Sequence, residues 1–401
     1  MKNRKFTLHP GILICCLILI KFLLARLLQG HPTDIMCFSV WSDKLGTLPP
    51  SEFYLPADYF ADYPPGYMLV LFIIGRIKNI LHITYDSALF NLMLKAPAIL
   101  ADVLLSYIIY KLLKKRSTAV FATNIMILVA LNPVLIINSS WWGQIDSFFT
   151  LFLILAVLAL YKNKVVSAIG FYTICATIKP QAFLFAPIFI VAFFSCKSLK
   201  TMLKSIAISI AVFLITLIPF RGLDIIWLIQ KYAGTLSSYA YATVNADNLY
   251  MLLGMNWADI SSNIFLKIFN IAVIVSTTLG AGFICIKMKD KSKYLLAAAF
   301  TVTILFNFAT KMHERYIFPA LIALAVYYAL NQKREILILL IANTISQFIS
   351  SYRVLYNTLK LQLPGLLAHS ASFVSLLNLI IFGYLVYFII IELKRDGEKS
   401  A

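Results

Sequence analysis

Apolar stretches long enough to cross a lipid bilayer recur from one end of this 401-residue chain to the other. A helix needs about 20 apolar residues to span the hydrocarbon core of a bilayer. Hydrophobic residues make up 61% of the chain and charged residues only 13%, too little charge to keep the surface of a soluble protein of this size hydrated. Because lipid cannot satisfy the open edge of a sheet, the spanning segments must be helices. The sequence therefore predicts an all-α, polytopic transmembrane helix bundle.

The apolar stretches predict about twelve membrane spans, within a bundle of about 11–13 helices. No internal repeat or low-complexity linker interrupts them, so residues 1–401 are predicted to form a single transmembrane domain. The predicted spans are 11–28, 88–110, 118–138, 141–160, 165–179, 182–196, 202–220, 262–286, 293–311, 314–331, 335–351 and 368–391.

The distribution of basic residues predicts the orientation of the chain. The 35 Lys and Arg residues outnumber the 17 Asp and Glu residues, for a net charge of +18. In a soluble protein this excess would suggest nucleic acid binding, but here the positive-inside rule explains it better, because the basic clusters are short and lie between apolar stretches. The rule places both termini in the cytoplasm, together with the clusters at 111–116, 162–164, 197–200, 287–293 and 333–334.

Two long segments, 29–87 and 221–261, are then left outside. If the apolar stretch 64–82 of the first segment crossed the membrane, the basic cluster 111–116 would lie outside, against the positive-inside rule. We therefore expect the stretch 64–82 to dip into the membrane from the outer side or to lie at the outer interface. Arg76 and Lys78 argue mildly for a crossing. The second segment is rich in Trp and Tyr, which is typical of an interfacial helix and equally compatible with an ordinary outer loop.

The predicted topology gathers polar side chains on the outer side of the membrane. Ionisable groups at membrane depth are candidates for function when they line a cavity. The candidate residues are Asp34, Tyr63, Trp142, Gln144, Asp146, Lys179, Gln181, Asn245, His313, Glu314, Arg315 and Tyr316.

Each candidate also has a structural interpretation. Asp34 could be a loop carboxylate, and Trp142 could anchor the chain at the interface. Gln144 and Asp146 could cap the helix that follows them. Lys179 could snorkel to the headgroups, and residues 313–315 could form an ordinary charged turn.

Lys95 and Asp102 lie within a predicted span, seven residues apart and therefore on one helical face. We interpret them first as structural residues, which pair with each other or face a cavity.

The chemistry of the candidate set favours transfer of a glycosyl group from a lipid phosphate. Arg and Lys suit a phosphate, a carboxylate suits deprotonation of a hydroxyl, and aromatic faces suit sugar rings and lipid chains. No glycine-rich nucleotide-binding motif is present. The six cysteines show no CxxC pair and no zinc-ligand spacing.

Several motifs resemble a known family. They are YPP at 63–65, NP-x(4)-NSSWWGQID at 132–146, KPQ at 179–181, NADNLYMLLG at 245–254 and MHERYIFP at 312–319. Together they resemble the bacterial and archaeal integral-membrane mannosyltransferase-like proteins related to the enzyme that adds the second mannose of the GPI anchor. This group belongs to the GT-C glycosyltransferase superfamily, and the resemblance covers most of the chain, from the first outer loop to about residue 319.

The resemblance implies a GT-C-like fold with a long, catalytic first outer loop. It implies inverting displacement of a hexose, with mannose favoured, from a polyprenyl-phosphate donor to an acceptor glycan, lipid or protein outside the cytoplasm. It also implies a carboxylate general base just after the first helix, a position matched by Asp34, with Asp146 as the second candidate. Asp34 lacks the acidic partner expected there, since Ile35 and Met36 follow it. This departure weakens the case for a divalent metal and leaves metal dependence open.

The resemblance implies further roles in donor binding. Lys179, His313 and Arg315 would hold the phosphate, and Tyr63, Trp142 and Gln144 would line the sugar or lipid pocket. Gln181, Asn245, Glu314 and Tyr316 complete the expected donor site. The alternative to an enzyme is a transporter, flippase or binding protein for lipid-linked sugars, which would share the size and the polar cavity.

Overall fold

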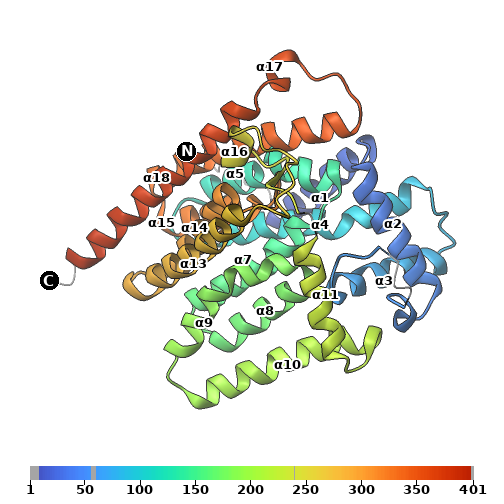
Figure 1. The fold of residues 1–401 in the computed structure, drawn as a ribbon, viewed down its shortest axis with the longest axis horizontal. Coiled ribbons are helices and arrows are strands. Elements are labelled where there is room, and N and C mark those ends of the chain that lie inside the picture. The colour runs from blue at the N-terminus through green and yellow to red at the C-terminus, as the bar shows by residue number, and fades with distance from the viewer. Residues whose placement is uncertain (1–8, 56–59, 239, 399–401) are drawn as a thin grey trace, which may run out of the picture.

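The computed structural model describes residues 9–55, 60–238 and 240–398, and over these residues the protein is almost entirely helical (Figure 1). The strands in the described part are two short segments, β1 (Thr243–Val244) and β2 (Met312–His313), which pair in parallel. The predicted all-α, polytopic bundle is confirmed at this level.

The helices follow one another along the chain with short connections. They are α1 Pro10–Leu27, α2 Pro32–Thr47, η1 Pro50–Glu52, α3 Pro65–Ile80, α4 Ala88–Leu113, α5 Ala119–Ala130, α6 Pro133–Leu135, η2 Ile136–Trp142, α7 Asp146–Tyr161, α8 Val165–Ile178, η3 Pro180–Phe185, α9 Ala186–Ser195, α10 Leu199–Arg221, α11 Ile225–Ser237, α12 Leu249–Leu252, α13 Ile264–Lys287, α14 Lys293–Phe308, α15 Phe318–Asn331, α16 Arg334–Thr358, α17 Gly365–Ala368 and α18 Ala371–Glu398.

Seven helical runs in the described residues are long and apolar enough to cross a membrane. They are α1, α4, the run Ala119–Trp142 from α5 to η2, α10, α13, α16 and α18. Five shorter apolar runs, at α7, α8, η3–α9, α14 and α15, coincide with the remaining predicted spans. The chain is therefore a multi-pass membrane protein, and the number of about twelve crossings stays a prediction.

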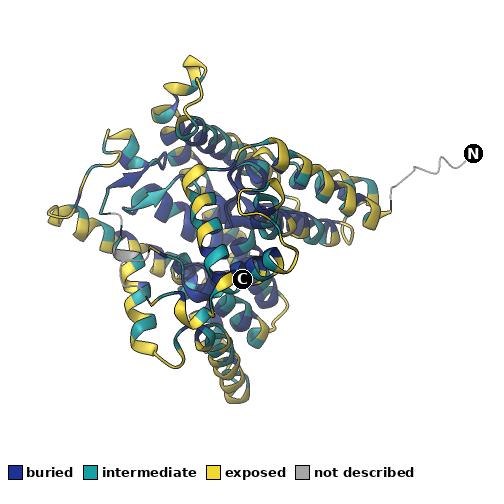
Figure 2. Ribbon diagram, turned by 90° about the vertical axis from the view of Figure 1, so that its right-hand side faces the viewer, coloured by how far each residue is buried: buried dark blue, intermediate teal, exposed yellow. Residues whose placement is uncertain are grey.

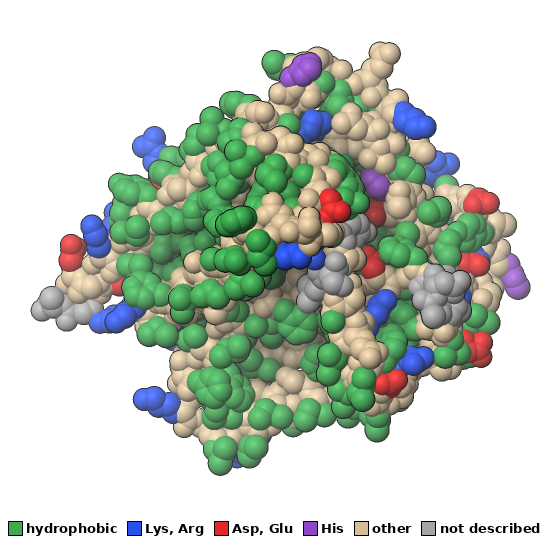
Figure 3. All heavy atoms as spheres, in the orientation of Figure 1, with side chains coloured by type: hydrophobic (Ala, Val, Ile, Leu, Met, Phe, Trp, Pro, Cys, Tyr) green, Lys and Arg blue, Asp and Glu red, His purple; other side chains and the backbone are tan. Residues whose placement is uncertain are grey.

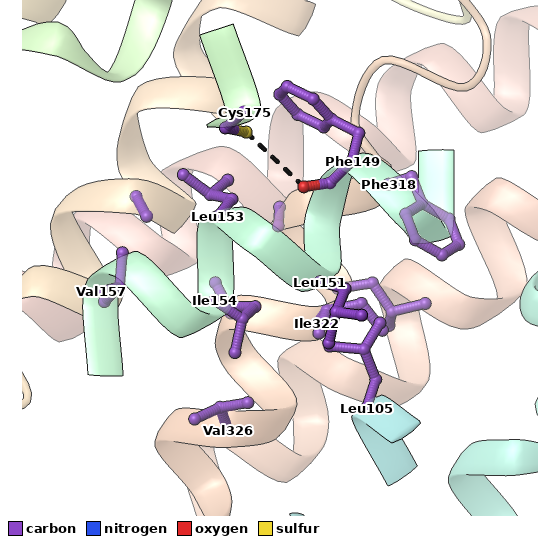
Figure 4. Close-up of a cluster of buried hydrophobic side chains, with 14 of the residues drawn as sticks. Leu105, Phe149, Leu151, Leu153, Ile154, Val157, Cys175, Phe318, Ile322 and Val326 are labelled. Carbon is purple, nitrogen blue, oxygen red and sulfur yellow. Dashed lines mark hydrogen bonds between the residues drawn. The ribbon is translucent and has the colours of Figure 1, made fainter. Parts of the chain in front are cut away.

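The core of the bundle forms around α7, which is apolar on every face. Leu153, Ile154 and Val157 of α7 are completely buried. In Figure 4, Leu153 lies toward Cys175 of α8, whereas Leu151 of the same helix lies toward Leu105 of α4 and Ile322 of α15. A helix that is hydrophobic all round is stable only when other helices surround it.

The outer helices expose apolar side chains instead of burying them. On α10, Ile206, Ile210 and Ile215 are exposed, and on α13, Phe265 and Leu279 are exposed. Figure 2 shows the buried residues concentrated inside the bundle. Hydrophobic side chains cover much of the face in Figure 3, with charged groups at its edges and a smaller number of acidic and basic groups near its middle. Such a surface suits lipid tails as the surrounding solvent.

The segment predicted as a long first loop contains a helical hairpin, α2 and α3. Its helices approach closely, because a Cβ at Gly75 would overlap the backbone of Ser42. The hydroxyl of Ser42 donates to the Leu71 carbonyl at 2.9 Å, and the Lys78 ammonium lies 2.6 Å from the Asp43 carboxylate. The predicted stretch 64–82 is therefore the single helix α3, which packs along α2.

The two charged residues predicted to share one face of a span do not pair with each other. Asp102 forms an ion pair with Lys21 of α1 at 2.9 Å. Lys95 donates to the carbonyls of Ala25, Leu28 and Ser140 at 3.0–3.1 Å, which satisfies backbone groups near the end of α1 and in η2. Both residues are completely buried and structural.

Candidate functional site

A polar cavity of about 140 Å³ lies where α2, the 60–63 segment, the end of α8, the end of α11 and the 313–316 turn meet. Its lining is the main candidate for a functional site, because charged, amide and aromatic side chains converge there. The lining residues are Thr33, Asp34, Cys37, Phe38, Trp41, Phe60, Asp62, Tyr63, Gln144, Lys179, Pro180, Gln181, Thr235, Ser238, His313, Arg315 and Tyr316.

Asp34 is held by donors from the 142–144 turn. Its Oδ2 accepts hydrogen bonds from Trp142 Nε1 and Gln144 Nε2, both at 2.6 Å. The Gln144 Oε1 accepts in turn from the Tyr63 hydroxyl at 3.3 Å. Burial alone would raise the pKa of Asp34, but the Arg315 charge and these donors lower it below its usual value. Asp34 is therefore a firmly ionised carboxylate.

Arg315 lies at the centre of the charged cluster. Its Nη1 is 2.9 Å from Glu314 and 3.7 Å from Asp34, and its Nε is 3.6 Å from Asp146. The guanidinium also lies over the Trp142 ring, 4.9 Å from its centroid. One cation thus organises three carboxylates, a task suited to the planar fork of arginine.

Asp146 and Lys179 form a second buried pair beside Arg315. Lys179 Nζ lies 2.6 Å from Asp146 Oδ1, and Asn138 donates to Asp146 Oδ2 at 2.9 Å. Asp146 does not line the 140 Å³ cavity, whereas Lys179 does. Lys179 therefore does not snorkel to the headgroups. Asp146 is the first residue of α7 but does not cap it, and neither does Gln144, because the N-cap residue is Ile145 and no side chain caps this helix.

An irregular backbone presents Trp142 and Gln144. α5 ends at Ala130, and after a break at residues 131–132 the chain continues through α6 into η2, a π-helix, so the predicted break near residue 138 is not observed. Such π-helical turns are frequent at functional sites. η2 ends at Gly143, whose φ of 86° favours glycine, and a Cβ there would meet the Ile35 side chain. The Trp142 carbonyl accepts from the His31 N–H at 3.0 Å, which ties this turn to the start of α2.

The 312–317 turn precedes α15, whereas the sequence predicted that the span starts at residue 314. α15 begins at Phe318 because Pro319 stands in its first turn, where proline is favoured. This leaves His313, Glu314 and Arg315 on irregular backbone beside the cavity. Burial, followed by the Arg315 charge, lowers the pKa of His313 to about 3. His313 is therefore neutral near pH 7 and would contact a phosphate only as a hydrogen-bond partner.

An apolar groove of about 460 Å³ adjoins the polar cavity. It runs between η3, α9, α13 and the end of α14, where Phe183, Leu184 and Ile274 are among its lining residues. The cavity and the groove share the lining residues Pro180, Gln181, Thr235, Ser238, His313 and Tyr316. In the described part of the chain, the buried Gln181 Oε1 has no hydrogen-bond partner, so it can accept a hydrogen bond from a ligand.

The three carboxylates of the cluster do not fit a divalent metal. Asp34, Asp146 and Glu314 all face Arg315, so a guanidinium already occupies the position between them. Among residues 9–55, 60–238 and 240–398, no group of three or more His, Cys, Asp or Glu side chains is arranged to hold an ion.

The structure brings together eleven of the twelve residues predicted from the sequence: Asp34, Tyr63, Trp142, Gln144, Asp146, Lys179, Gln181, His313, Glu314, Arg315 and Tyr316. The twelfth, Asn245, lies apart from the cavity lining. Its side-chain oxygen accepts hydrogen bonds from Asn256 and Trp257, both at 3.1 Å. Its backbone forms an isolated β-bridge with the backbone of His313.

Sequence reasoning missed several residues at the site. Asn138, which holds Asp146, and His31, whose ring stacks on Trp142 with centroids 4.7 Å apart, were not among the predicted site residues. Neither were Asp62, Thr235 and Ser238, which line the cavity. The His31-Pro32 pair directly after the first span was a usable signal, because proline in the first turn marks a helix start.

The fold and the site define a class: a multi-pass helical membrane protein with a charged cavity that opens into an apolar groove. Comparison with protein-family models gave no match, and neither did comparison with curated proteins.

Proposed function

We propose that this protein is a membrane glycosyltransferase that moves a hexose, with mannose favoured, from a polyprenyl-phosphate donor to an acceptor on the extracytoplasmic side. The observation that carries the proposal is that the charged cavity and the apolar groove share six lining residues. A ligand that fills both must combine a bulky polar part with a long apolar chain. A lipid-linked sugar has this form.

The cations of the cavity suit the phosphate of such a donor. Lys179 and Arg315 both line the cavity. The described ion pairs of Arg315 use Nη1 and Nε, which leaves its Nη2 edge for a ligand oxygen. Preorganised cations also stabilise the charge that develops on a departing phosphate. Lys179 and Arg315 are therefore the proposed leaving-group contacts.

The remaining lining suits a sugar ring. Tyr63, Trp41 and Phe38 supply aromatic faces, and Gln181 supplies an unpaired amide oxygen. A sugar ring has both apolar and polar surface, and a lining of aromatic faces beside amide groups complements both. The proposed sugar site is therefore the part of the cavity between Tyr63 and Gln181.

A turnover assay tests the proposal. The purified protein in lipid nanodiscs is incubated with radiolabelled polyprenyl-phosphate mannose or glucose, with water and added sugars or glycerol as acceptor hydroxyls, and release of the sugar from the lipid is followed. We expect turnover by the wild type and a loss of about 10²–10³-fold in Arg315→Ala, because a preorganised charge contact is removed. Arg334→Ala changes an exposed arginine at the start of α16 and is the matched control.

The assay also separates the proposal from its alternative. Saturable donor binding without turnover by the wild type would contradict the enzyme and favour a transporter or binding protein for lipid-linked sugars, which a lipid-flipping assay would then test. The absence of both binding and turnover would contradict the lipid-linked ligand itself.

A further inference from the structure

Two carboxylates line the polar cavity, Asp34 and Asp62, and their surroundings differ. Asp34 Oδ2 receives two hydrogen bonds at 2.6 Å and lies 3.7 Å from both Arg315 and His31. These contacts stabilise the charged form, and a carboxylate stabilised in this way is a weak proton acceptor. Asp34 is therefore suited to holding the 142–144 turn and Arg315 in place.

The side chain of Asp62 is not engaged in this way. Within the described residues, no hydrogen bond or ion pair from another side chain reaches its carboxylate, which lines the cavity and is stabilised by its own backbone N–H. Its backbone is nevertheless fixed, because the Thr235 hydroxyl of α11 donates to the Asp62 carbonyl at 2.7 Å. The nearby Lys231 ammonium donates to the Ala61 carbonyl. Asp62 thus combines a fixed position with a carboxylate that is open to a ligand.

The charges around Asp62 act in opposite directions on its pKa. Burial raises the pKa of Asp62 most. Lys231, its own backbone N–H and Lys179 lower this pKa and Asp34 raises it, with a net shift above the ordinary value. The titratable groups that face it are Asp34, Cys37, Tyr54, Tyr63, Lys179, Lys231 and Tyr316. A carboxylate with a raised pKa is a stronger base than Asp34 at the same pH.

We propose that Asp62, rather than Asp34, is the general base of this site and that the acceptor is a hydroxyl compound. This inference rests on the proposed function. In the step, the acceptor oxygen forms a bond to the anomeric carbon of the hexose, and the bond from that carbon to the phosphate oxygen breaks. The hydroxyl proton passes to an Asp62 carboxylate oxygen. The electron pair of the broken bond leaves with the lipid phosphate, beside Lys179 and Arg315.

The test compares Asp62→Asn with Asp34→Asn in nanodiscs, using radiolabelled polyprenyl-phosphate mannose for both binding and turnover. We expect Asp62→Asn to lose about 10²–10⁴-fold in turnover, as removal of a general base does, with a donor Kd within about threefold of the wild type. Asp34→Asn is expected to weaken donor binding as well, because the cluster around Arg315 loses a partner. Asp62→Glu keeps the carboxylate and is expected to recover part of the turnover.

The pH dependence of the wild type gives a readout that does not depend on whether a variant folds. A base works when deprotonated, so kcat/KM falls as the pH falls through the pKa of the base. If Asp62 is the base, the acid limb lies above about 3.9, the ordinary value for aspartate. If Asp34 is the base, it lies below that value, since the pKa of Asp34 is lowered.

Three results would overturn the inference. The first is a turnover rate of Asp62→Asn within about tenfold of that of an active wild type. The second is an acid limb of the wild-type kcat/KM profile at a pH below the ordinary pKa of aspartate. A wild type without turnover on any lipid-phosphate hexose would overturn the proposed function, and this inference with it, so the two failures are distinguishable.

Discussion

At the residue scale, Lys21 and Asp102 form an ion pair inside the helix bundle, and both side chains are fully buried. Asp102 also accepts from the Ser139 hydroxyl of η2 at 2.5 Å. Breaking a buried pair by removing one partner leaves an uncompensated charge, whereas replacing both partners removes the desolvation penalty as well. This pair holds α1 and α4 against the π-helix that presents Trp142.

We therefore predict non-additive effects on stability. Lys21→Met should destabilise the fold by about 3–5 kcal/mol, and the double variant Lys21→Met, Asp102→Leu should be more stable than Lys21→Met alone. Thermal unfolding of the four proteins of this double-mutant cycle in detergent measures the coupling. Additive losses in the two single variants would show that the pair does not act as a unit.

The polar residues of the site could be predicted from the sequence because charged and amide groups are rare in such an apolar chain. Their partners could not. Lys179 pairs with Asp146, 33 residues away, and Trp142 with Asp34, 108 residues away. Pairing over these separations depends on how the helices pack. This is also why Asp62 could be seen in the sequence but not distinguished from Asp34.

At the element scale, the α2–α3 hairpin depends on two glycines. A Cβ at Gly46 would lie 2.8 Å from the Gly75 carbonyl oxygen, and a Cβ at Gly75 would overlap the Ser42 carbonyl. Small residues at such crossings let helix backbones approach closely. The apolar stretch of α3 could be predicted from the sequence, but its close packing on α2 could not. Gly46 and Gly75 differ from other glycines only in lying where the two helices cross, which the sequence does not show.

Gly75→Ala should consequently destabilise the hairpin by about 1–3 kcal/mol, because the added methyl group must push the helices apart. Gly383→Ala on α18 is the matched control, since a Cβ there meets nothing within 4 Å, and it should be neutral or slightly stabilising. Unfolding temperatures in detergent measure both variants. Equal temperatures for the two would contradict tight packing at Gly75.

Helix α11 has two distinct faces. Ile225, Ile226 and Ile229 are exposed, whereas Tyr232 donates to the Ala176 carbonyl at 2.7 Å and Thr235 lines the cavity. An amphipathic helix of this kind is typical of a membrane interface. Of the two alternatives for the segment 221–261, we therefore predict the interfacial placement for α11.

Quenching by brominated lipid tests this placement. A fluorophore attached at Ile226→Cys should be quenched by lipids brominated near the headgroup, whereas one at Lys360→Cys, on the exposed loop after α16, should be quenched less. Equal quenching at both positions would place α11 away from the bilayer.

At the scale of the whole molecule, hydropathy alone predicts the helical bundle, because lipid leaves the backbone no alternative. It cannot predict where helices break, since a break such as that at Lys179-Pro180 is stable only when protein covers the freed backbone groups. The site assembles at several such irregular points, from the start of α2 to the 312–317 turn. A combined polar cavity and apolar groove is thus a property of the folded chain.

Protection of Cys37 tests the central claim, that the cavity and the groove form one site for a lipid phosphate. Cys37 lines the cavity, and burial raises the pKa of its thiol to about 11, so its alkylation is slow enough to time. The other cysteines that are not fully buried, Cys15, Cys16 and Cys196, are first changed to alanine. The rate is measured in nanodiscs with polyprenyl phosphate, polyprenol or inorganic phosphate.

We expect polyprenyl phosphate, at about ten times its Kd, to slow alkylation of Cys37 about tenfold. Inorganic phosphate at the same concentration should have no effect, and Thr277→Trp, which fills the groove, should abolish the protection. Unchanged alkylation with polyprenyl phosphate, or equal protection by inorganic phosphate, would contradict a single site that binds the lipid chain and its phosphate together.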